Sequence, residues 1–248
     1  MRISTLEMYD RLETNKANQE FYSKISQQLI MQKINAPETL TNAKDQLKLW
    51  KSKDLFFSQT CGLPYKMFLH NKVTLIGTPD YGVKGCEPGY YNSVFVVREE
   101  NRNKSVEEFN EANLAVNDYF SQSGWAAPQN YMKNLQLKFN EVILSGSHLN
   151  SAKLVSEGKA DITAIDAISF KMIQKYDDFS ANLSIIGMTN PTPGLPFIAY
   201  QGADTKIFHR AVKNAIDTIS SKSKKALQIK GLISIPKSEY LTLQQPSA

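Results

Sequence analysis

The sequence predicts an α/β fold. Runs that favour strands alternate with runs that favour helices along almost the whole chain of 248 residues. Several strand-like runs consist of Val, Ile, Leu or Phe without polar alternation, which is typical of strands covered on both faces. The helix-like runs carry apolar residues on one side and begin at Ser, Thr or Asp, as amphipathic helices with capped starts do.

Two long helices have clear apolar spacing. The first is expected over residues 14–33, where Phe21, Ile25 and Leu29 recur every fourth residue. The other is expected over residues 204–220, beginning at an aspartate that can cap it. Ser105 and Glu108 have the spacing of a capping box, so a further helix is expected to start there. Eight strands are expected at residues 54–57, 73–77, 93–98, 114–117, 142–144, 162–165, 183–187 and 197–200.

Composition excludes several classes of protein. With 42% hydrophobic and 21% charged residues, the chain is neither disordered nor collagen-like, and it is long enough to bury one large core or two smaller ones. No apolar run approaches the ~18 to 20 residues that a membrane-spanning helix needs. The formal charge of +5 is a mild excess that either favours anionic small molecules or only helps solubility, and it does not by itself indicate nucleic acid.

The start of the chain and the two cysteines bear on the compartment. Residues 1–6 lack the basic start, apolar stretch and cleavage site of a secretory signal, so either the protein is cytoplasmic or a signal was removed before this numbering. Cys61 and Cys86 lie outside any Cys-x-x-Cys spacing, which gives no support to a zinc site or a thioredoxin-like motif. A disulfide and two reduced, buried thiols both remain open.

Two predicted strands are followed by serine-rich loops, at the sheet edge where α/β proteins bind ligands. Ser121 and Ser123 precede one helix, and Ser147 and His148 precede the next. The first N–H groups of a helix lack internal partners and lie at the positive end of its dipole, so they attract an anion. For the first loop alone, an ordinary serine cap is the simpler interpretation. His148, at a helix start beside three serines, favours a ligand role.

Two further strand ends carry polar groups. Asp166 ends the strand over 162–165, and it either caps the next helix or faces a ligand. Residues 58–65 follow another strand and either form a tight turn or contribute hydrogen-bonding groups to a site. Four polar strand ends in one chain predict a ligand cleft, and the combination is more informative than any single member.

Catalytic motifs are not found in the sequence. Ser147 and His148 are neighbours at a helix start, where adjacent side chains point in different directions, so they make a poor nucleophile and base. There is no His-Glu-x-x-His helix, phosphate-binding loop or Gly-x-Gly-x-x-Gly turn. The three histidines, the others being His70 and His209, are far apart in sequence. We therefore predict no catalytic residue, no metal and no cofactor.

Six polar segments follow one another in a distinctive order. They are Met8-Tyr9-Asp10, residues 58–62, Ser121-Gln122-Ser123-Gly124, Ser145-Gly146-Ser147-His148, residues 160–166 and residues 192–196. This ordered set, spread over nearly the whole chain, resembles the phosphate/phosphonate solute-binding proteins of ABC transporters. The resemblance implies a type 2 periplasmic-binding-protein fold, in which two α/β lobes joined by two crossing strands close over a small ligand.

The resemblance also implies lobe boundaries and a ligand set. Residues 1–92 and 192–248 would form lobe 1, and residues 93–191 lobe 2. Family members bind oxyanions through hydroxyls, histidine and helix starts. Position by position, this role falls on Ser121, Ser123, Ser147 and His148, with Tyr9, Thr60, Tyr65 and Asp166 supplied from the surrounding strand ends. The matched loops contain no Lys or Arg, so neutral donors and helix dipoles would hold the anion.

The implied function is that of a non-enzymatic solute-binding protein of an ABC importer. It would capture a small oxyanion, such as a phosphonate or phosphate, and present it to a membrane permease, as a periplasmic monomer that binds no nucleic acid. The resemblance also places Cys61 near Cys86 and so favours a disulfide. Alternatives are an enzyme of cofactor biosynthesis on the same fold, with His148 and Asp166 transferring protons, and a cytoplasmic ligand sensor. Aromatic residues such as Tyr81 and Trp125 leave a larger or cationic organic ligand open.

Overall fold

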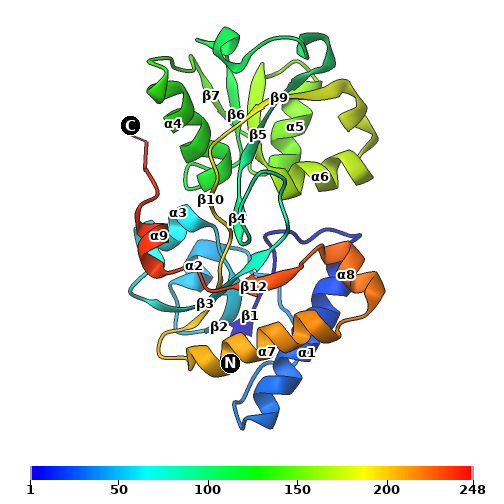
Figure 1. The fold of residues 1–248 in the computed structure, drawn as a ribbon, viewed down its shortest axis with the longest axis vertical. Coiled ribbons are helices and arrows are strands. Elements are labelled where there is room, and N and C mark those ends of the chain that lie inside the picture. Colours follow the sequence, from blue (N-terminus) through cyan, green and yellow to red (C-terminus); the bar gives the residue numbers. More distant parts are fainter. Residues whose placement is uncertain (1, 247–248) are drawn as a thin grey trace. The chain divides into compact units, whose positions relative to one another are not determined.

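The computed structural model describes residues 2–246 (Figure 1), whose contacts divide into two units. Unit 1 contains the residues up to Gly82, Glu87–Gly89 and Pro193–Thr242. Unit 2 contains Val83–Cys86, Tyr90–Thr192 and the residues from Leu243 on. Compared with the expected lobes, residues 83–86, 90–92, 192 and 243–246 group with unit 2 and not with unit 1. The short strands β4 (Tyr90–Tyr91) and β10 (Thr192–Pro193), where the chain passes between the units, form a two-stranded sheet.

Unit 1 is built on a five-stranded sheet with the order β1-β2-β11-β3-β12. Its strands are β1 (Ile3–Ser4), β2 (Leu55–Gln59), β3 (Val73–Asp80), β11 (Phe197–Tyr200) and β12 (Gly231–Ile233). β1 and β2 are parallel, whereas β11 runs antiparallel to both β2 and β3. β2 and β3 therefore end at the same edge of the sheet, and Thr60 and Tyr65 follow β2 whereas Tyr81 follows β3.

Aromatic packing joins the helices of unit 1 to its sheet. These helices are α1 (Asn15–Met31), α2 (Gln46–Trp50), α3 (Gly62–Pro64) with the π-helical turn η1 (Tyr65–Leu69), α7 (Thr205–Thr218), α8 (Ser221–Leu227) and α9 (Lys237–Leu241). Phe57 of β2 stacks on Phe197 of β11 at 5.4 Å and on Phe208 of α7 at 6.5 Å. All three rings are buried with Phe21 of α1. Burial of each such side chain contributes about 1.5–3 kcal/mol.

Unit 2 has a second five-stranded sheet, with the order β7-β6-β8-β5-β9. Its strands are β5 (Ser93–Arg98), β6 (Leu114–Val116), β7 (Val142–Leu144), β8 (Ile162–Asp166) and β9 (Leu183–Met188). β7, β6 and β8 are parallel neighbours, whereas β5 runs antiparallel to β8 and β9. The carboxyl ends of three adjacent strands therefore meet at one edge.

Helices cover both faces of the unit 2 sheet (Figure 1). They are η2 (Glu99–Asn101), η3 (Val106–Phe109), η4 (Gln122–Ala126), α4 (Ala127–Asn134), α5 (His148–Ser156), α6 (Ala167–Tyr176) and η5 (Asp178–Asn182). Along β5, Val94 and Val96 pack toward α5 and α6, whereas Phe95 and Val97 pack with Met132 of α4. Burial on both faces is confirmed for this strand. The edge strands β7 and β9 are partly exposed, because each has a neighbour on one side only.

All eight expected strands are present, and both long helices begin within a residue of their predicted starts. The helix expected after Ser121 and Ser123 begins at Gln122, with a π-helical turn, so Ser123 lies within its first turn and not before it. The capping box of Ser105 and Glu108 starts the four-residue 3₁₀ helix η3.

The structure also shows the state of the two cysteines and the character of the helices. Neither Cys61, which precedes α3 in unit 1, nor Cys86, which belongs to unit 2, forms a disulfide, so the bridge favoured by the resemblance is not present. Within residues 2–246, no helix has both the length and the apolar character needed to cross a bilayer.

Candidate functional site

Three helix starts lie at the carboxyl edge of the unit 2 sheet. The strands β7, β6 and β8 are adjacent and parallel, and each leads into a helix: β7 into α5, β6 into the continuous helix over 122–134, and β8 into α6. These helices have at least nine residues each, enough to form full turns with free N–H groups at the start. This edge carries five of the eight residues that the sequence predicts as ligand contacts.

Two of the predicted serines cap the helices. Ser121 Oγ accepts a hydrogen bond from the Gly124 N–H at 3.0 Å, and Ser147 Oγ accepts one from the Asn150 N–H at 3.1 Å. Each bond satisfies one of the four N–H groups that lack partners at a helix start. The capping role that the sequence left open for Ser121 is therefore observed, and Ser147 has the same role.

The structure pairs Ser123 with His148, although 25 positions separate them. Ser123 Oγ lies 2.9 Å from His148 Nε2, and Ser123 is buried. Burial lowers the pKa of His148 to about 4, so the imidazole is neutral at pH 7. Its other nitrogen, Nδ1, has no exposed surface and no hydrogen-bond partner among residues 2–246. A hydroxyl and a neutral imidazole are thus held together between the starts of two helices.

Asn117 belongs to the same group and was not predicted as a site residue. Its Oδ1 is buried without a hydrogen-bond partner among the described residues. A Cβ atom added to Gly124 would lie 1.9 Å from Asn117 Oδ1 and 3.1 Å from His148 Cε1, so only glycine fits there. The sequence feature that could have identified Asn117 as a site residue is its position directly after β6 and before the serine loop.

Asp166 is a buried helix cap. One carboxylate oxygen accepts hydrogen bonds from the N–H groups of Ile168 at 2.7 Å and Ser169 at 3.0 Å. Ser93, its partner across β5 and β8, donates a hydrogen bond from Oγ to the carbonyl of Ser123 at 2.9 Å. Asp166 therefore has the capping role that the sequence allowed, and Ser93 connects its strand pair to the serine loop.

Exposed apolar side chains accompany the polar groups of this edge. Tyr119 and Phe120, 46% and 37% exposed, lie in the loop between β6 and η4, and Tyr119 packs edge-on against Trp125 at 5.3 Å. Leu144 and Met188, the last residues of β7 and β9, are 56% and 57% exposed. The edge therefore combines hydrogen-bond donors with apolar surface.

In unit 1, Thr60 and Tyr65 are buried in the segment after β2. The Thr60 N–H donates to the Pro196 carbonyl at 3.0 Å, and its hydroxyl donates to the Cys61 carbonyl at 3.4 Å. Tyr65 packs edge-on against Tyr240 at 5.3 Å, and burial raises its pKa to about 12. Its hydroxyl is therefore protonated, and able to donate, throughout the physiological range.

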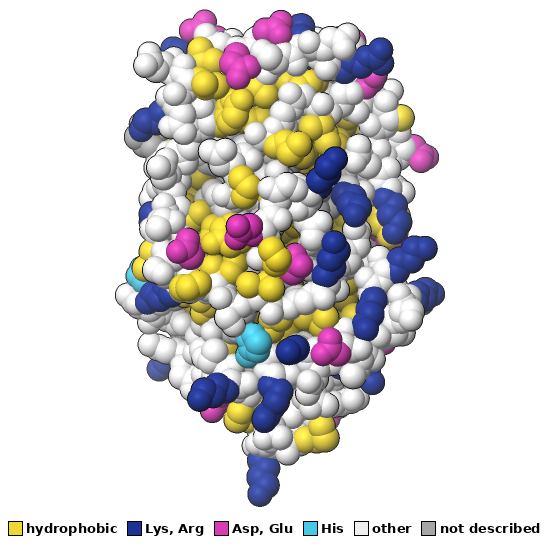
Figure 2. Space-filling view, in the orientation of Figure 1, with side chains coloured by type: hydrophobic (Ala, Val, Ile, Leu, Met, Phe, Trp, Pro, Cys, Tyr) yellow, Lys and Arg dark blue, Asp and Glu magenta, His cyan; other side chains and the backbone are white. Residues whose placement is uncertain are grey.

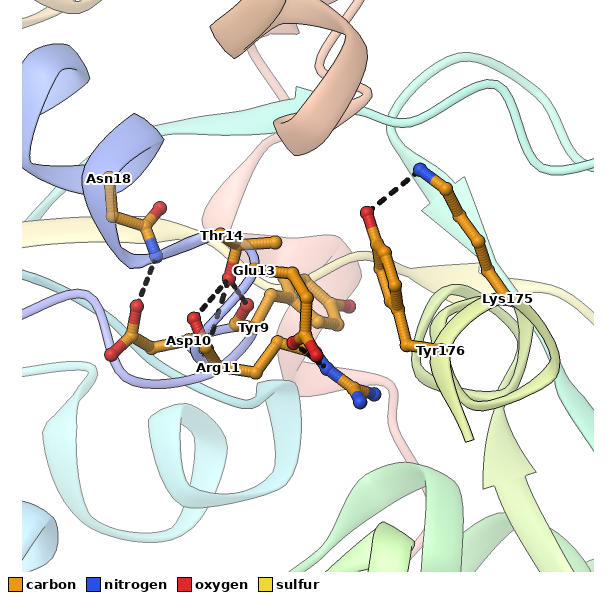
Figure 3. A network of polar contacts seen from close by, with 8 residues as sticks. All are labelled: Tyr9, Asp10, Arg11, Glu13, Thr14, Asn18, Lys175 and Tyr176. Atoms are coloured by element: carbon orange, nitrogen blue, oxygen red, sulfur yellow. Dashed lines mark hydrogen bonds and ion pairs between the residues drawn. The ribbon is translucent and has the colours of Figure 1, made fainter. Parts of the chain in front are cut away.

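Tyr9 lies in a fixed loop before α1 (Figure 3). The Thr14 hydroxyl donates to the Tyr9 carbonyl at 2.9 Å and accepts from the Arg11 N–H at 3.0 Å. The Asn18 amide donates to the Asp10 carboxylate at 2.8 Å. These bonds connect the loop to the first turn of α1 and so set the position of Tyr9.

Tyr81 contacts Tyr9 in unit 1, and Gln59 in turn contacts Tyr81. The rings of Tyr9 and Tyr81 meet edge-on at 5.1 Å. Gln59 is buried, and its amide donates to the Tyr81 hydroxyl at 3.2 Å and to the Leu195 carbonyl at 3.0 Å. Gln59 was missed because a single glutamine at a strand end carries no distinctive sequence signal. Across residues 2–246, no group of three or more His, Cys, Asp or Glu side chains is arranged to hold a metal ion.

Comparison with known proteins gives a family and a set of related structures. Residues 3–240 match the family described as "ABC transporter, phosphonate, periplasmic substrate-binding protein". No curated protein sequence is similar enough to give a match. Among solved structures, PhnD1 from Prochlorococcus marinus in complex with methylphosphonate has a TM-score of 0.72 and 17% identity, covering 96% of this chain and 94% of its own.

Two further structures are similar over most of their length. XAC2383 from Xanthomonas citri, bound to chloride ion, has a TM-score of 0.71 and 14% identity and covers 98% of this chain and 95% of its own. A binding protein component of an ABC phosphonate transporter from Pseudomonas aeruginosa has a TM-score of 0.70 and 13% identity, with coverages of 97% and 84%. These likenesses confirm the type 2 periplasmic-binding-protein fold.

Proposed function

The chain belongs to the family of periplasmic substrate-binding proteins of phosphonate ABC transporters, and we propose that its solute is a phosphonate with a small apolar substituent. As a member of this family it is a solute-binding protein of an ABC importer. The finer proposal concerns the ligand and its contacts: Ser123, His148 and the helix starts at the carboxyl edge of the unit 2 sheet bind the phosphonate oxygens.

The hydrogen bond between Ser123 and His148 carries this proposal. A neutral imidazole can donate from Nε2 to Ser123 Oγ, which leaves the serine hydroxyl hydrogen free to donate to an anion. The start of the helix over 122–134 and the start of α5 add backbone N–H groups and the positive ends of two helix dipoles. Neutral donors of this kind bind an oxyanion without a cationic side chain.

The expected strength is sufficient for a transport protein. Hydrogen bonds to a charged group contribute about 1.5–3 kcal/mol each, so four or five of them, less the cost of ordering the ligand, reach the ~8 kcal/mol of a micromolar complex. The loops 117–124 and 145–148 contain no Lys or Arg, so this binding energy would come from hydroxyls, the imidazole and backbone N–H groups.

The apolar surface favours a phosphonate over inorganic phosphate. Tyr119, Phe120 and Leu144 expose apolar groups close in sequence to the donors of the site. Inorganic phosphate has only oxygens to offer, whereas an alkylphosphonate places a carbon substituent on the phosphorus. The related PhnD1 structure from Prochlorococcus marinus contains methylphosphonate. For this chain we propose methylphosphonate or a phosphonate of similar size.

We also propose that the protein binds its ligand without transforming it. A catalytic Ser-His pair needs a third group that orients the imidazole, and His148 Nδ1 has no such partner among residues 2–246. This observation supports a binding role for Ser123 and His148. The family supports two further parts of the proposal, a periplasmic location and a membrane permease as partner. We propose in addition that the protein is a monomer.

Calorimetric titration tests the ligand. We expect methylphosphonate to bind with one-to-one stoichiometry and a micromolar or lower Kd, and to bind at least ~10-fold more tightly than inorganic phosphate or sulfate. Mass spectrometry of the recovered ligand should show it unchanged. A preference for phosphate, or a chemically altered ligand, would contradict the proposal.

The ligand contacts of unit 1 are tested separately. Tyr9, Thr60 and Tyr65 remain candidates, and Tyr65→Phe is the most selective change because it removes only a hydroxyl from a buried ring that keeps its packing on Tyr240. We expect about a 10-fold loss of methylphosphonate affinity with an unchanged melting temperature of the empty protein. Unchanged affinity would remove Tyr65 from the site.

A further inference from the structure

Positive charge is concentrated in one segment of unit 1. Unit 1 contains 19 Lys and Arg against 12 Asp and Glu, a formal charge of +7, whereas unit 2 contains 10 against 12, a formal charge of −2. The segment over residues 205–230, which forms α7 and α8, holds seven Lys or Arg and a single acid, Asp217. One tenth of the chain thus carries almost all of the excess charge of its unit.

The seven cations are exposed and together form what we call the basic face. They are Lys206, Arg210, Lys213, Lys222, Lys224, Lys225 and Lys230. Along α7 the cations stand at i, i+4 and i+7, on the side opposite the buried Phe208, Val212 and Ala215. Figure 2 shows Lys and Arg side chains over the part of the surface where α7 and α8 lie in Figure 1.

Carboxylates do not neutralise the basic face. None of its seven cations forms an ion pair within residues 2–246, whereas ion pairs are found elsewhere, as between Arg98 and Glu100 and between Lys159 and Glu157. Glu20 of α1, which packs beside α8, accepts hydrogen bonds from Ser220 and Ser223. The face therefore presents an uncompensated positive potential to solvent.

The composition of the basic face identifies the class of its partner. Six of the seven cations are lysines, which are depleted in protein–protein interfaces and act as hydrated point charges rather than as bidentate groups. The exposed large hydrophobic residues of the described chain all lie outside residues 205–230, so this face exposes no Phe, Tyr or Trp for stacking on bases or for anchoring in a protein pocket. The interaction that this composition favours is therefore electrostatic attraction to a surface with a high density of negative charge.

We propose that the basic face binds the anionic headgroups of a lipid bilayer. Lysine clusters bind such surfaces through charge alone, without insertion of apolar side chains, and the attraction extends about one Debye length, ~8–10 Å at physiological ionic strength. Binding of this kind would hold the protein close to the membrane that contains its permease. The proposal concerns residues 205–230 only and does not depend on which solute the protein binds.

Co-sedimentation with lipid vesicles tests the proposal. We expect the full chain to pellet with vesicles of phosphatidylglycerol and phosphatidylcholine, to stay in solution with phosphatidylcholine alone, and to be released by about 0.5 M salt. A triple variant of α8, Lys222→Glu with Lys224→Glu and Lys225→Glu, should lose at least ~100-fold in apparent affinity, because each cation near an anionic surface contributes about a fivefold factor.

A matched variant separates local from global charge. Lys104→Glu with Lys153→Glu and Lys171→Glu changes the net charge equally, but its three exposed lysines lie in unit 2. We expect this variant to pellet nearly as well as the parent. Equal loss in both triple variants, binding to phosphatidylcholine alone, or tighter binding to duplex DNA or to polyglutamate than to anionic vesicles would overturn the proposal.

A second triple variant, in α7, serves as a control for loss of folding. Lys206→Gln with Arg210→Gln and Lys213→Gln removes the three cations of α7 with residues that favour helix, so the helix itself should be preserved. We expect an unchanged melting temperature and a vesicle affinity at least ~10-fold lower than that of the parent. Unchanged vesicle affinity in this variant would exclude α7 from the contact and overturn the assignment of the face.

Discussion

Replacement of Ser123 by alanine tests the proposed anion contact directly. The Ser123 hydroxyl is buried and lies 2.9 Å from His148 Nε2, so it is fixed in position before a ligand arrives. Loss of one hydrogen bond to a charged ligand costs about 1.5–3 kcal/mol, which corresponds to a 10- to 150-fold higher Kd. In the empty protein the same change removes the neutral hydrogen bond to His148 Nε2, worth about 0.5–1.5 kcal/mol, and the longer 3.4 Å contact with Ser121 Oγ. Calorimetric titration with methylphosphonate and thermal melting of the empty protein measure the two effects separately.

Ser26→Ala is the matched control for this change. Ser26 is buried on α1, and its hydroxyl donates to the Pro37 carbonyl at 2.8 Å, so its loss also removes one buried neutral hydrogen bond. We expect a similar decrease in stability without any change in Kd. The reasoning is refuted if Ser123→Ala binds methylphosphonate as tightly as the parent, or if Ser26→Ala weakens binding by the same factor.

Three further predictions concern the same edge. Gly124→Ala should lower the free energy of unfolding by about 1–3 kcal/mol and raise the Kd for methylphosphonate, because the added Cβ would lie 1.9 Å from Asn117 Oδ1. Gly231→Ala is the control, and it should change neither quantity appreciably because nothing lies within 4 Å of its Cβ. Asp166→Ala should lose about 1–2 kcal/mol of stability in denaturant unfolding because two N–H groups of α6 lose their acceptor; a loss no larger than that of Asp166→Asn would argue against the cap. The pKa of His148 falls from 6.5 in the unfolded chain to about 4 in the folded one, so its contribution to stability is fully present above pH 6.5 and decreases as the pH falls toward 4, by about 2 kcal/mol at pH 5. Unfolding measured at pH 7 and pH 5 should show this decrease, and His148→Gln should show a smaller one.

Much of the fold could be predicted because its signals are local. The uninterrupted apolar run of β5 reflects the packing of Val94 on one face of the sheet and Phe95 on the other. Asp204 caps α7 by accepting from the Ile207 N–H, as its position before the amphipathic run predicts. Elements such as β1 and β12 are two and three residues long and have no pattern of their own, because their pairing with β2 and β3 defines them.

The site was predicted less completely because its contacts join distant segments. A serine at a helix start can be recognised from sequence, and Ser121 and Ser147 are indeed caps. The contact between Ser123 and His148 depends on the order β7-β6-β8 in the sheet, which no local pattern specifies. The sequence indicated that Ser147 and His148, as neighbours, make a poor pair, and the actual partner of His148 lies 25 residues away.

The Ser121-Gln122-Ser123-Gly124 loop explains why two serines are needed where one would cap the helix. Ser121 gives its oxygen to the Gly124 N–H and is therefore occupied by the helix. Ser123, two residues further along the chain, does not cap and is held by His148 instead. Gly124 allows this arrangement because any side chain would displace Asn117. A capping serine, a serine proposed to bind the ligand and a glycine together form one unit, so a change in any of the three should reduce ligand affinity, and a change in the capping serine should in addition remove the helix cap.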